Sequence, residues 1–276
     1  MTALTPLLSV HNLVVDYVGD IRDVRAVDDV SFDIAPGEVF GLAGESGCGK
    51  STIAFAISRL LKAPAVISGG KVLFEGQDVL RLPPAELAAL RWRRIAMVFQ
   101  SAMNALNPVM TVEAQFRDVL AAHEGLSRHA ARERAAELMR LVDIPPDRLK
   151  DYPHQFSGGM RQRIVIAIAL ALNPRLVVMD EPTTALDVIV QREILDKIAA
   201  LRARFGFSIL FITHDLGLMT EYCDRIGVML AGRLVEQGTA QAIYKNPQHD
   251  YTRRLWASFP RLPGRQVELA PTGSLP

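Results

Sequence analysis

Hydrophobic positions in the first hundred residues predict a mainly β segment with helices between some of its strands. Val30, Phe32 and Ile34 alternate with polar residues before the turn at Pro36-Gly37, as they do in a half-buried strand. The expected strands are 9–17, 26–34, 39–43, 72–74 and 95–99. The expected helices are 52–61 and 83–94, and the second begins with two prolines.

The pattern becomes helical in the middle of the chain and then alternates. Residues 112–142 predict two amphipathic helices, with Ser127 as N-cap of the second. Apolar runs at 176–179 and 209–213 then flank a helix at 188–204, which Asp187 caps. This alternation predicts βαβ units and a mostly parallel sheet.

The last part of the chain predicts a β-hairpin and then an irregular tail. The hairpin strands are expected at 225–230 and 233–238, joined through Ala231-Gly232. Beyond Pro247 further prolines follow, so we expect this tail to wrap around the domain or to extend from it.

Composition and charge exclude several classes of protein. The 276 residues carry 31 Lys and Arg against 30 Asp and Glu, which argues against a sequence-independent binder of nucleic acid. Two cysteines give no disulfide framework and fit a reducing compartment. The mean hydropathy of +0.16 is high. However, the longest apolar run, 164–172, is far below the roughly 20 residues that span a bilayer, and residues 1–10 do not resemble a signal peptide. We therefore expect a cytoplasmic, soluble and unusually apolar protein.

A glycine-rich segment between an expected strand and an expected helix fits the phosphate-loop (Walker A) pattern. Its glycines let backbone N–H groups point at phosphates, and the helix N-terminus that follows adds positive potential. Lys50 is expected to reach the β- and γ-phosphates, and the Ser51 hydroxyl to bind Mg²⁺. An ordinary glycine-rich turn is the alternative, and Cys48 is expected to be loop filler rather than a redox switch. The predicted nucleotide-binding residues of this segment are Gly44, Ser46, Gly47, Cys48, Gly49, Lys50, Ser51 and Thr52.

Two acidic residues end the apolar run at 176–179. Buried strands of α/β sheets deliver side chains to ligands at their carboxyl ends. Asp180 could hold Mg²⁺ through water, and Glu181 could orient or deprotonate an attacking water. A solvated strand end is the alternative when this pair is taken alone, but a phosphate loop upstream favours the catalytic interpretation.

The segment Phe156-Ser157-Gly158-Gly159-Met160-Arg161-Gln162 resembles the signature sequence of ATP-binding cassette (ABC) ATPases, usually Leu-Ser-Gly-Gly-Gln. Phe and Met here replace the Leu and the final Gln of that pattern. The resemblance implies that Ser157, Gly158, Gly159 and Gln162 act in trans, facing the γ-phosphate held by the opposite subunit. A Ser-capped helix start after a turn is the simpler alternative for the segment by itself.

Four further residues match motifs of this family in order. Gln100 resembles the Q-loop glutamine, which touches Mg²⁺ and senses the membrane partner. Asp187, in Ala185-Leu186-Asp187, resembles the D-loop residue that crosses the dimer interface. His214 resembles the switch histidine at the γ-phosphate. Tyr17 resembles the A-loop aromatic that stacks on adenine, although it could also be only a half-buried strand residue.

The resemblance covers most of the chain and implies a fold. That fold is α/β: a RecA-like P-loop NTPase core with an antiparallel β edge and an inserted helical subdomain, the ABC ATPase fold. The expected core is 1–100 and 174–245, the helical subdomain with the signature is 101–173, and the tail is 246–276. Activity would be ATP hydrolysis at a dimer interface, with Glu181 and His214 catalytic.

Several segments resemble the oligopeptide/dipeptide (Opp/Dpp) importer branch of the family. They are Gly44-Glu45-Ser46-Gly47, Ala105-Leu106-Asn107-Pro108, residues 156–163, and the tail segments 249–253 and 260–264. The resemblance implies a second ATPase subunit that is a different chain, two membrane permease subunits and, indirectly, an extracellular solute-binding protein. It places the chain at the cytoplasmic face of the membrane as a peripheral subunit. The cofactors would be ATP and Mg²⁺. No cysteine follows Cys223, so no iron–sulfur cluster is expected.

Other solutes and other classes stay open at this point. Residues 101–104 depart from the Asp-Pro common after the Q-loop glutamine, which leaves an oligosaccharide importer open, and a nickel importer of the same branch is a further alternative. An exporter cassette and a soluble ABC ATPase of DNA repair or translation are remote alternatives. Soluble members generally carry two cassettes or a coiled-coil insertion, and neither pattern occurs here.

Overall fold

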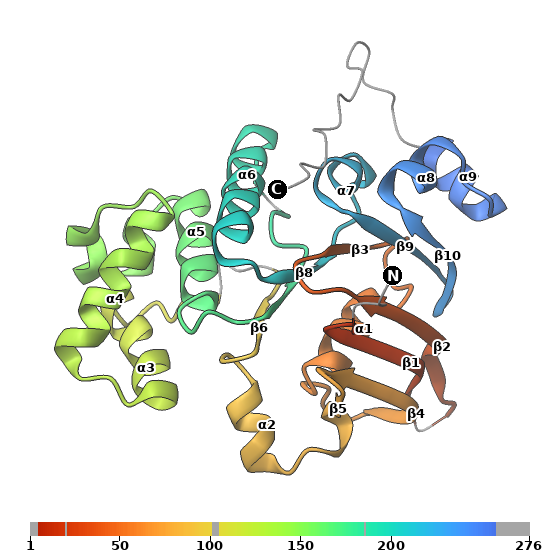
Figure 1. Cartoon of the computed structure of the whole chain (residues 1–276), viewed down its shortest axis with the longest axis horizontal. Coiled ribbons are helices and arrows are strands. Elements are labelled where there is room, and N and C mark those ends of the chain that lie inside the picture. The colour runs from red at the N-terminus through yellow and green to blue at the C-terminus, as the bar shows by residue number, and fades with distance from the viewer. Residues whose placement is uncertain (1–4, 20, 101–104, 185, 258–276) are drawn as a thin grey trace.

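The computed structural model describes residues 5–19, 21–100, 105–184 and 186–257. Figure 1 shows β-strands gathered on one side of the molecule and a group of helices on the other. The strands are β1 (Leu8–Tyr17), β2 (Val24–Ile34), β3 (Val39–Ala43), β4 (Ala65–Phe74), β5 (Gln77–Asp78), β6 (Ile95–Val98), β7 (Leu176–Asp180), β8 (Ser208–Ile212), β9 (Arg225–Leu230) and β10 (Arg233–Thr239). The α-helices are α1 (Lys50–Ile57), α2 (Pro84–Leu90), α3 (Val112–Glu124), α4 (Arg128–Leu141), α5 (Gly158–Ala169), α6 (Val188–Phe205), α7 (Leu216–Tyr222), α8 (Ala240–Lys245) and α9 (Asp250–Ala257).

The described strands form two sheets. One has the order β10-β9-β3-β8-β7-β6, in which β10 is antiparallel and the other neighbours are parallel. The other is antiparallel, with the order β2-β1-β4-β5. The mostly parallel sheet and the antiparallel edge expected from the sequence are thus confirmed. Because parallel strands share a direction, the loops after β3, β7 and β8 leave the sheet at one edge.

The central strands are buried on both faces, which explains their unbroken apolar sequences. In β7, Val177 and Met179 face the cluster formed with α3–α8, whereas Leu176 and Val178 face the cluster that includes α1 and the antiparallel sheet. The sheet carrying β3 therefore lies between two hydrophobic cores.

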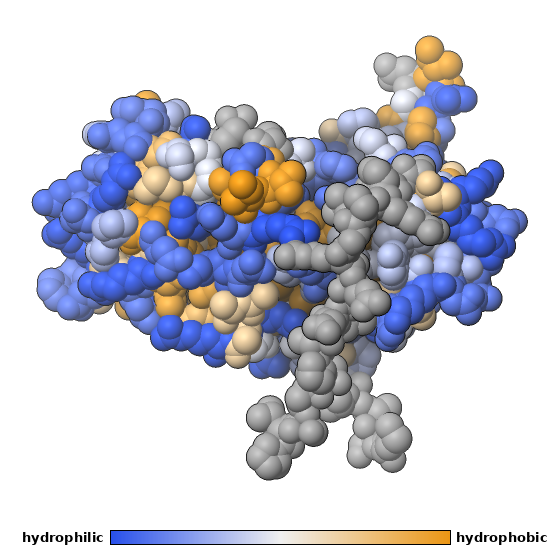
Figure 2. All heavy atoms as spheres, turned by 90° about the horizontal axis from the view of Figure 1, so that it is seen from above, coloured by the Kyte–Doolittle hydropathy of each residue, from blue (hydrophilic) through white to orange (hydrophobic). Residues whose placement is uncertain are grey.

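The helical half confirms the amphipathic and capping patterns. Ser127 caps α4 by accepting from the N–H of Ala130, and Asp187 caps α6. The apolar run 164–172 is buried throughout, in α5 and the turn after it, so it accounts for part of the high hydropathy. Figure 2 shows hydrophobic patches between hydrophilic side chains over this half of the molecule. Across the residues described, no helix combines the length and the apolar character needed to cross a membrane.

Several elements differ from the sequence-based expectation: α1 ends at Ile57 rather than at residue 61, and the short β5, α7 and α8 were not predicted. Two further differences have a clear physical reason. Strand β4 begins at Ala65 rather than at residue 72, and it pairs with β1 along its length. The sequence hides its first half because Ser68-Gly69-Gly70 separates the short apolar run 65–67 from Val72. Beyond Pro247 the chain does not simply extend: α9 forms and buries Tyr251 and Thr252. Its eight residues are too few for the helical period to stand out.

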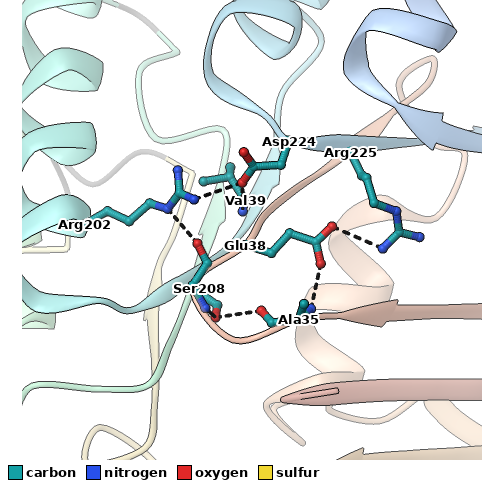
Figure 3. A network of polar contacts seen from close by, with 8 residues as sticks. Ala35, Glu38, Val39, Arg202, Ser208, Asp224 and Arg225 are labelled. Carbon is teal, nitrogen blue, oxygen red and sulfur yellow. Dashed lines mark hydrogen bonds and ion pairs between the residues drawn. The ribbon is translucent and has the colours of Figure 1, made fainter. Parts of the chain in front are cut away.

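A polar network fixes the turn before β3, the strand that leads into the phosphate loop (Figure 3). The buried carboxylate of Glu38 accepts from the N–H of Ala35 at 2.6 Å and pairs with Arg225 at 3.1 Å. Asp224 accepts from the N–H of Val39 at 2.8 Å and from Arg202 at 3.0 Å. Side chains from β9 and α6 thereby hold the start of β3.

Candidate active site

The phosphate loop connects β3 to α1, and two of its glycines are sterically required. Gly49 is the N-cap of α1 with φ +104°, and a Cβ there would overlap the carbonyl oxygen of Ala26. Gly44 has φ +144°, and a Cβ there would overlap the carbonyl oxygen of Met229. Only glycine fits both the backbone conformation and the space. The strand–loop–helix context expected from the sequence is present.

Lys50 lies inside this loop. Its side chain is 6% exposed, and Nζ donates to the carbonyl oxygens of Gly44 at 2.7 Å and Glu45 at 2.8 Å. Within the described part of the chain, no carboxylate forms an ion pair with it. The loop thus holds an ammonium group that is bound to backbone carbonyls rather than paired directly with a carboxylate, and it can attract an anion.

Asp180 and Ser51 meet across the start of α1. The Ser51 hydroxyl donates to Asp180 Oδ1 at 3.1 Å, and Asp180 is 3% exposed at the end of β7. Burial raises the pKa of Asp180, as does the nearby Glu181, while the Ser51 hydrogen bond and Lys50 act in the opposite direction. A hydroxyl and a carboxylate oxygen side by side are the hard donors that fit Mg²⁺.

Glu181 joins the ends of three adjacent strands. Its Oε2 accepts from Gln100 Nε2 at 2.6 Å and from the hydroxyl of Thr184 at 3.0 Å, and its Oε1 lies 3.6 Å from Nδ1 of His214. The backbone of Glu181 has φ +47°, and its N–H donates to the carbonyl of Ile212 in β8. The structure therefore brings Gln100, Glu181 and His214 together after β6, β7 and β8. Sequence reasoning missed Thr184, which carries no motif of its own.

Tyr17 lies at the edge of the same site. Its hydroxyl is 3.4 Å from the hydroxyl of Thr52 in the first turn of α1, although the two residues are 35 positions apart. Tyr17 is half-buried at the end of β1, so both interpretations of the sequence agree with its place. The ring is near enough to the loop to serve a bound nucleotide.

The signature residues open α5, as the sequence indicates. Ser157 is the N-cap, and its hydroxyl accepts from the N–H of Met160 at 3.3 Å. Gly159 packs against α6, where a Cβ would lie 2.5 Å from Val190 Cγ1. The signature and the start of α6 are thus in direct contact. Gln162 is only 2% exposed, and its Nε2 has no partner among the described groups, so its side chain lies inside the molecule rather than on the signature's surface.

Arg148 makes several contacts with the signature segment, which sequence reasoning missed. Its guanidinium lies 4.2 Å from the centre of the Phe156 ring, and NH1 is 3.9 Å from Met160 Sδ. It also donates to Asp151 at 2.8 Å and to the carbonyl of Gln155 at 2.8 Å. Both positions at which the motif departs from the usual pattern, Phe156 and Met160, therefore contact one arginine.

Asp187 has a local structural role. Its Oδ1 accepts from the N–H groups of Ile189 at 3.1 Å and Val190 at 3.0 Å, and so caps α6. Ala185, in the same predicted loop, lies outside the described residues. Immediately after the cap, Val188 is 69% exposed and Ile189 is 73% exposed. This is an apolar surface beside the signature.

The signature and the phosphate loop occupy different places in one chain. Figure 1 shows α5 within the helical half, whereas α1 packs between the two sheets. One chain therefore supplies the loop, the carboxylates and His214 at one place and the N-terminus of α5 at another.

Comparisons with known proteins agree with this arrangement. A family model described as "ABC transporter" matches residues 27–184. The chain is 48% identical over 263 residues to the peptidoglycan transport ATP-binding protein YejF of Agrobacterium fabrum, covering 94% of this chain and 48% of that one. It is 45% identical to the dipeptide transport ATP-binding protein DppD of Bacillus subtilis, covering 98% and 82%. For the oligopeptide transport ATP-binding protein OppD of the same organism, the identity is 46% and the coverage 95% and 74%. The chain thus spans about half of YejF, 82% of DppD and 74% of OppD.

Solved structures lead to the same family. The dimeric ATP-binding cassette MJ0796, in a post-hydrolysis state bound to ADP and Pi, superposes with a TM-score of 0.75 at 28% identity. This match covers 84% of the present chain and 98% of that cassette. The mixed α/β fold of the chain is that of such cassettes. The chain belongs to the ABC transporter family and is one of its ATP-binding ATPase cassettes.

Proposed function

We propose that this ATPase cassette powers the uptake of peptides through partner membrane subunits. The observation that carries the ATPase part is the convergence of Lys50, Ser51–Asp180 and Glu181–His214 at one sheet edge. The solute is inferred from relatives, because OppD and DppD are named for oligopeptide and dipeptide transport. This supports peptides over nickel or oligosaccharides.

The loop would bind the phosphates of ATP. The Lys50 ammonium would move from the carbonyls of Gly44 and Glu45 to phosphate oxygens, and the N-terminus of α1 would add its backbone N–H groups. Ser51 and Asp180 would hold Mg²⁺, with Gln100 as the third expected ligand. Bound Mg²⁺ would offset the negative charge that develops on the transferred phosphoryl group.

Glu181 would orient the water that attacks the γ-phosphate. Gln100 and Thr184 both donate to Oε2 of its carboxylate and His214 lies near Oε1, so both oxygens have a neighbour before the substrate arrives. Fixed donors and acceptors of this kind lower the barrier because they need no reorganisation during the reaction. His214 would contact the same phosphate, as the family resemblance implies.

A second ATPase subunit would complete the site. The exposed Ser157 cap presents the N-terminus of α5 outward, and the exposed Val188 and Ile189 beside it offer apolar area for a partner. The dimeric state of MJ0796 supports this arrangement. Following the resemblance to the importer branch, we propose that this partner is a different chain rather than a second copy.

Membrane subunits would dock between the core and the helical half. A groove of about 550 Å³ lies there, with Leu90 and Arg93 on one side and Glu124 and Leu172 on the other. Such a groove suits a short helix with both apolar and charged side chains. We propose that the chain works there as a peripheral protein at the cytoplasmic face, fed by an extracellular binding protein.

Reconstitution tests this function. The cassette, its partner ATPase and its permease subunits are placed in vesicles with binding protein that is empty or loaded with peptide, oligosaccharide or nickel, and ATP hydrolysis is measured. We expect stimulation by the peptide-loaded protein only. Stimulation by a loaded sugar or metal alone would contradict the peptide assignment, and failure to associate with permease subunits would favour a soluble cassette.

The name of YejF motivates one further arm of the same experiment. That relative is named for peptidoglycan transport, and peptidoglycan fragments carry both sugar and peptide. A binding protein loaded with such a fragment would distinguish a cell-wall peptide from an ordinary oligopeptide.

A further inference from the structure

The C-terminal helix α9 reaches the phosphate loop through Tyr251. The Tyr251 hydroxyl accepts a hydrogen bond from the backbone N–H of Glu45 at 3.3 Å, across 206 positions of sequence. Tyr251 is 6% exposed and Thr252 is fully buried, so this side of α9 is packed rather than lying loosely on the surface. No motif of the sequence connects these two segments.

Glu45 also holds the lysine of the loop. Its carbonyl oxygen accepts from Lys50 Nζ at 2.8 Å, while its N–H donates to Tyr251. The backbone of Glu45 is therefore held at its N–H by Tyr251 of α9 and at its carbonyl by Lys50. A shift of this residue would move the Lys50 ammonium.

The start of α9 is itself anchored to the hairpin formed by β9 and β10. The Glu236 carboxylate accepts from the N–H groups of Gln248 at 2.7 Å and His249 at 3.0 Å. Nδ1 of His249 accepts from the N–H of Tyr251 at 3.1 Å. These bonds fix the backbone position of Tyr251. Its hydroxyl therefore reaches the loop from an anchored residue.

The same hairpin touches the loop at a second point. The N–H of Gly232, in the hairpin turn, donates to the carbonyl of Cys48 at 3.2 Å. The loop is thus attached at Cys48 directly and at Glu45 through α9. Two attachments on either side of Gly47 limit how far the loop can open.

We propose that Tyr251 is a positioning residue of the nucleotide site, whose hydroxyl keeps the Glu45 backbone, and with it Lys50, in the conformation that receives phosphates. It acts through the loop and does not touch the nucleotide. This proposal rests on nucleotide binding by the loop and is independent of which solute is imported.

Removing only the hydroxyl separates this role from packing. In the full chain, Tyr251→Phe keeps the ring and loses the bond to Glu45, whereas Tyr244→Phe in α8 removes a hydroxyl from a half-exposed ring as the matched control. Loss of one buried hydrogen bond predicts a dissociation constant for MgATP about three to ten times higher for Tyr251→Phe. We expect an unchanged turnover number at saturating ATP, and no change for the control.

The two cysteines provide a second readout. Cys48 lies in the loop and Cys223 lies far from it in sequence, and they are 7% and 8% exposed. If Tyr251→Phe loosens the loop, alkylation of Cys48 becomes faster by at least threefold while that of Cys223 does not change. MgATP should slow the alkylation of Cys48 in both proteins.

The outcomes are distinguishable. The proposal requires both the weaker MgATP binding and the faster alkylation of Cys48 alone, and it is wrong if either is missing. Faster alkylation of both cysteines would also overturn it, because it would mean general loosening. If the unmodified chain bound no MgATP, the nucleotide site itself would be refuted, together with the role of Tyr251.

Discussion

At the scale of single residues, the carboxylate of Asp180 lies at the end of β7 with 3% of its surface exposed, next to the carboxylate of Glu181. Burial and this neighbour penalise its charged form and raise its pKa. The folded state therefore binds this proton more tightly than the unfolded chain does. As the pH rises from the ordinary pKa of 3.8 through the raised pKa, the proton is lost and the folding stability falls. Asp180 is thus placed for metal binding at the expense of stability.

Asp180→Asn should therefore stabilise the nucleotide-free protein. The amide oxygen can still accept from Ser51, and the buried charge is gone, so we expect a gain of about 1 kcal/mol near pH 7 together with loss of Mg²⁺-dependent ATP hydrolysis. Thermal unfolding checks this, and the gain should shrink as the pH falls toward 3.8. A variant less stable than the original at neutral pH would contradict the account.

Residues that carry a motif could be found from sequence, and residues that act through distant contacts could not. Lys50 could be found because it stands in a glycine-rich loop between a strand and a helix. Asp180 and Glu181 could be found because they directly follow an apolar strand. Arg148 belongs to no motif, and the contact of Tyr251 with Glu45 joins two segments that are remote in sequence, so only the folded chain reveals these contacts. The burial of Gln162 could not be predicted either, because the sequence does not show whether a polar side chain of this apolar helix points inward or outward.

At the scale of elements, the position of β3 decides where the phosphate loop begins. Its N-terminal turn is held by Glu38, which is 8% exposed and bridges the N–H of Ala35 and the guanidinium of Arg225 (Figure 3). Asp224, just before β9, and Arg202 in α6 add a second support. The supports come from elements that follow β3 by more than 150 residues, so the loop is complete only when the whole sheet has formed.

Glu38→Ala should destabilise the fold. It removes the acceptor of the Ala35 N–H and the carboxylate partner of Arg225, whose guanidinium keeps its bond to the carbonyl of Asp33. We therefore expect the free energy of unfolding to fall by about 2 kcal/mol. Urea unfolding measures this. Glu133→Ala, on the exposed face of α4, should change stability by no more than about 0.5 kcal/mol. Equal effects of the two changes would show that the network does not anchor β3.

Elements with a strong period were predictable, and those set by pairing were not. The helices α3, α4 and α6 lie within a few residues of their expected bounds because caps and periodic apolar residues mark them. The first half of β4 has neither, and it is a strand because β1 offers it an edge to pair with. The helix α9 forms where the anchored residues before it and the buried Tyr251 dock onto the core.

At the scale of the whole molecule, our proposal is that a second cassette completes the nucleotide site. The N-terminus of α5 and the loop before α1 lie apart in Figure 1, and an apolar surface at Val188 and Ile189 flanks the first of them. A second cassette would cover this surface and bring its own signature to the bound nucleotide. The order of the motifs predicted the family, while the separation of the two half-sites is visible only in the structure.

The most direct test of the account is Glu181→Gln in the assembled ATPase. Gln keeps the size of the side chain and its contacts with Gln100 and Thr184, but it cannot orient or deprotonate water as a carboxylate does. We expect normal MgATP binding, turnover lower by about 100-fold or more, and accumulation of a closed dimer held together by ATP. Phosphate release measures the turnover, and size-exclusion chromatography measures the closed dimer. Unchanged hydrolysis in this variant would contradict the assignment of Glu181 as the catalytic carboxylate.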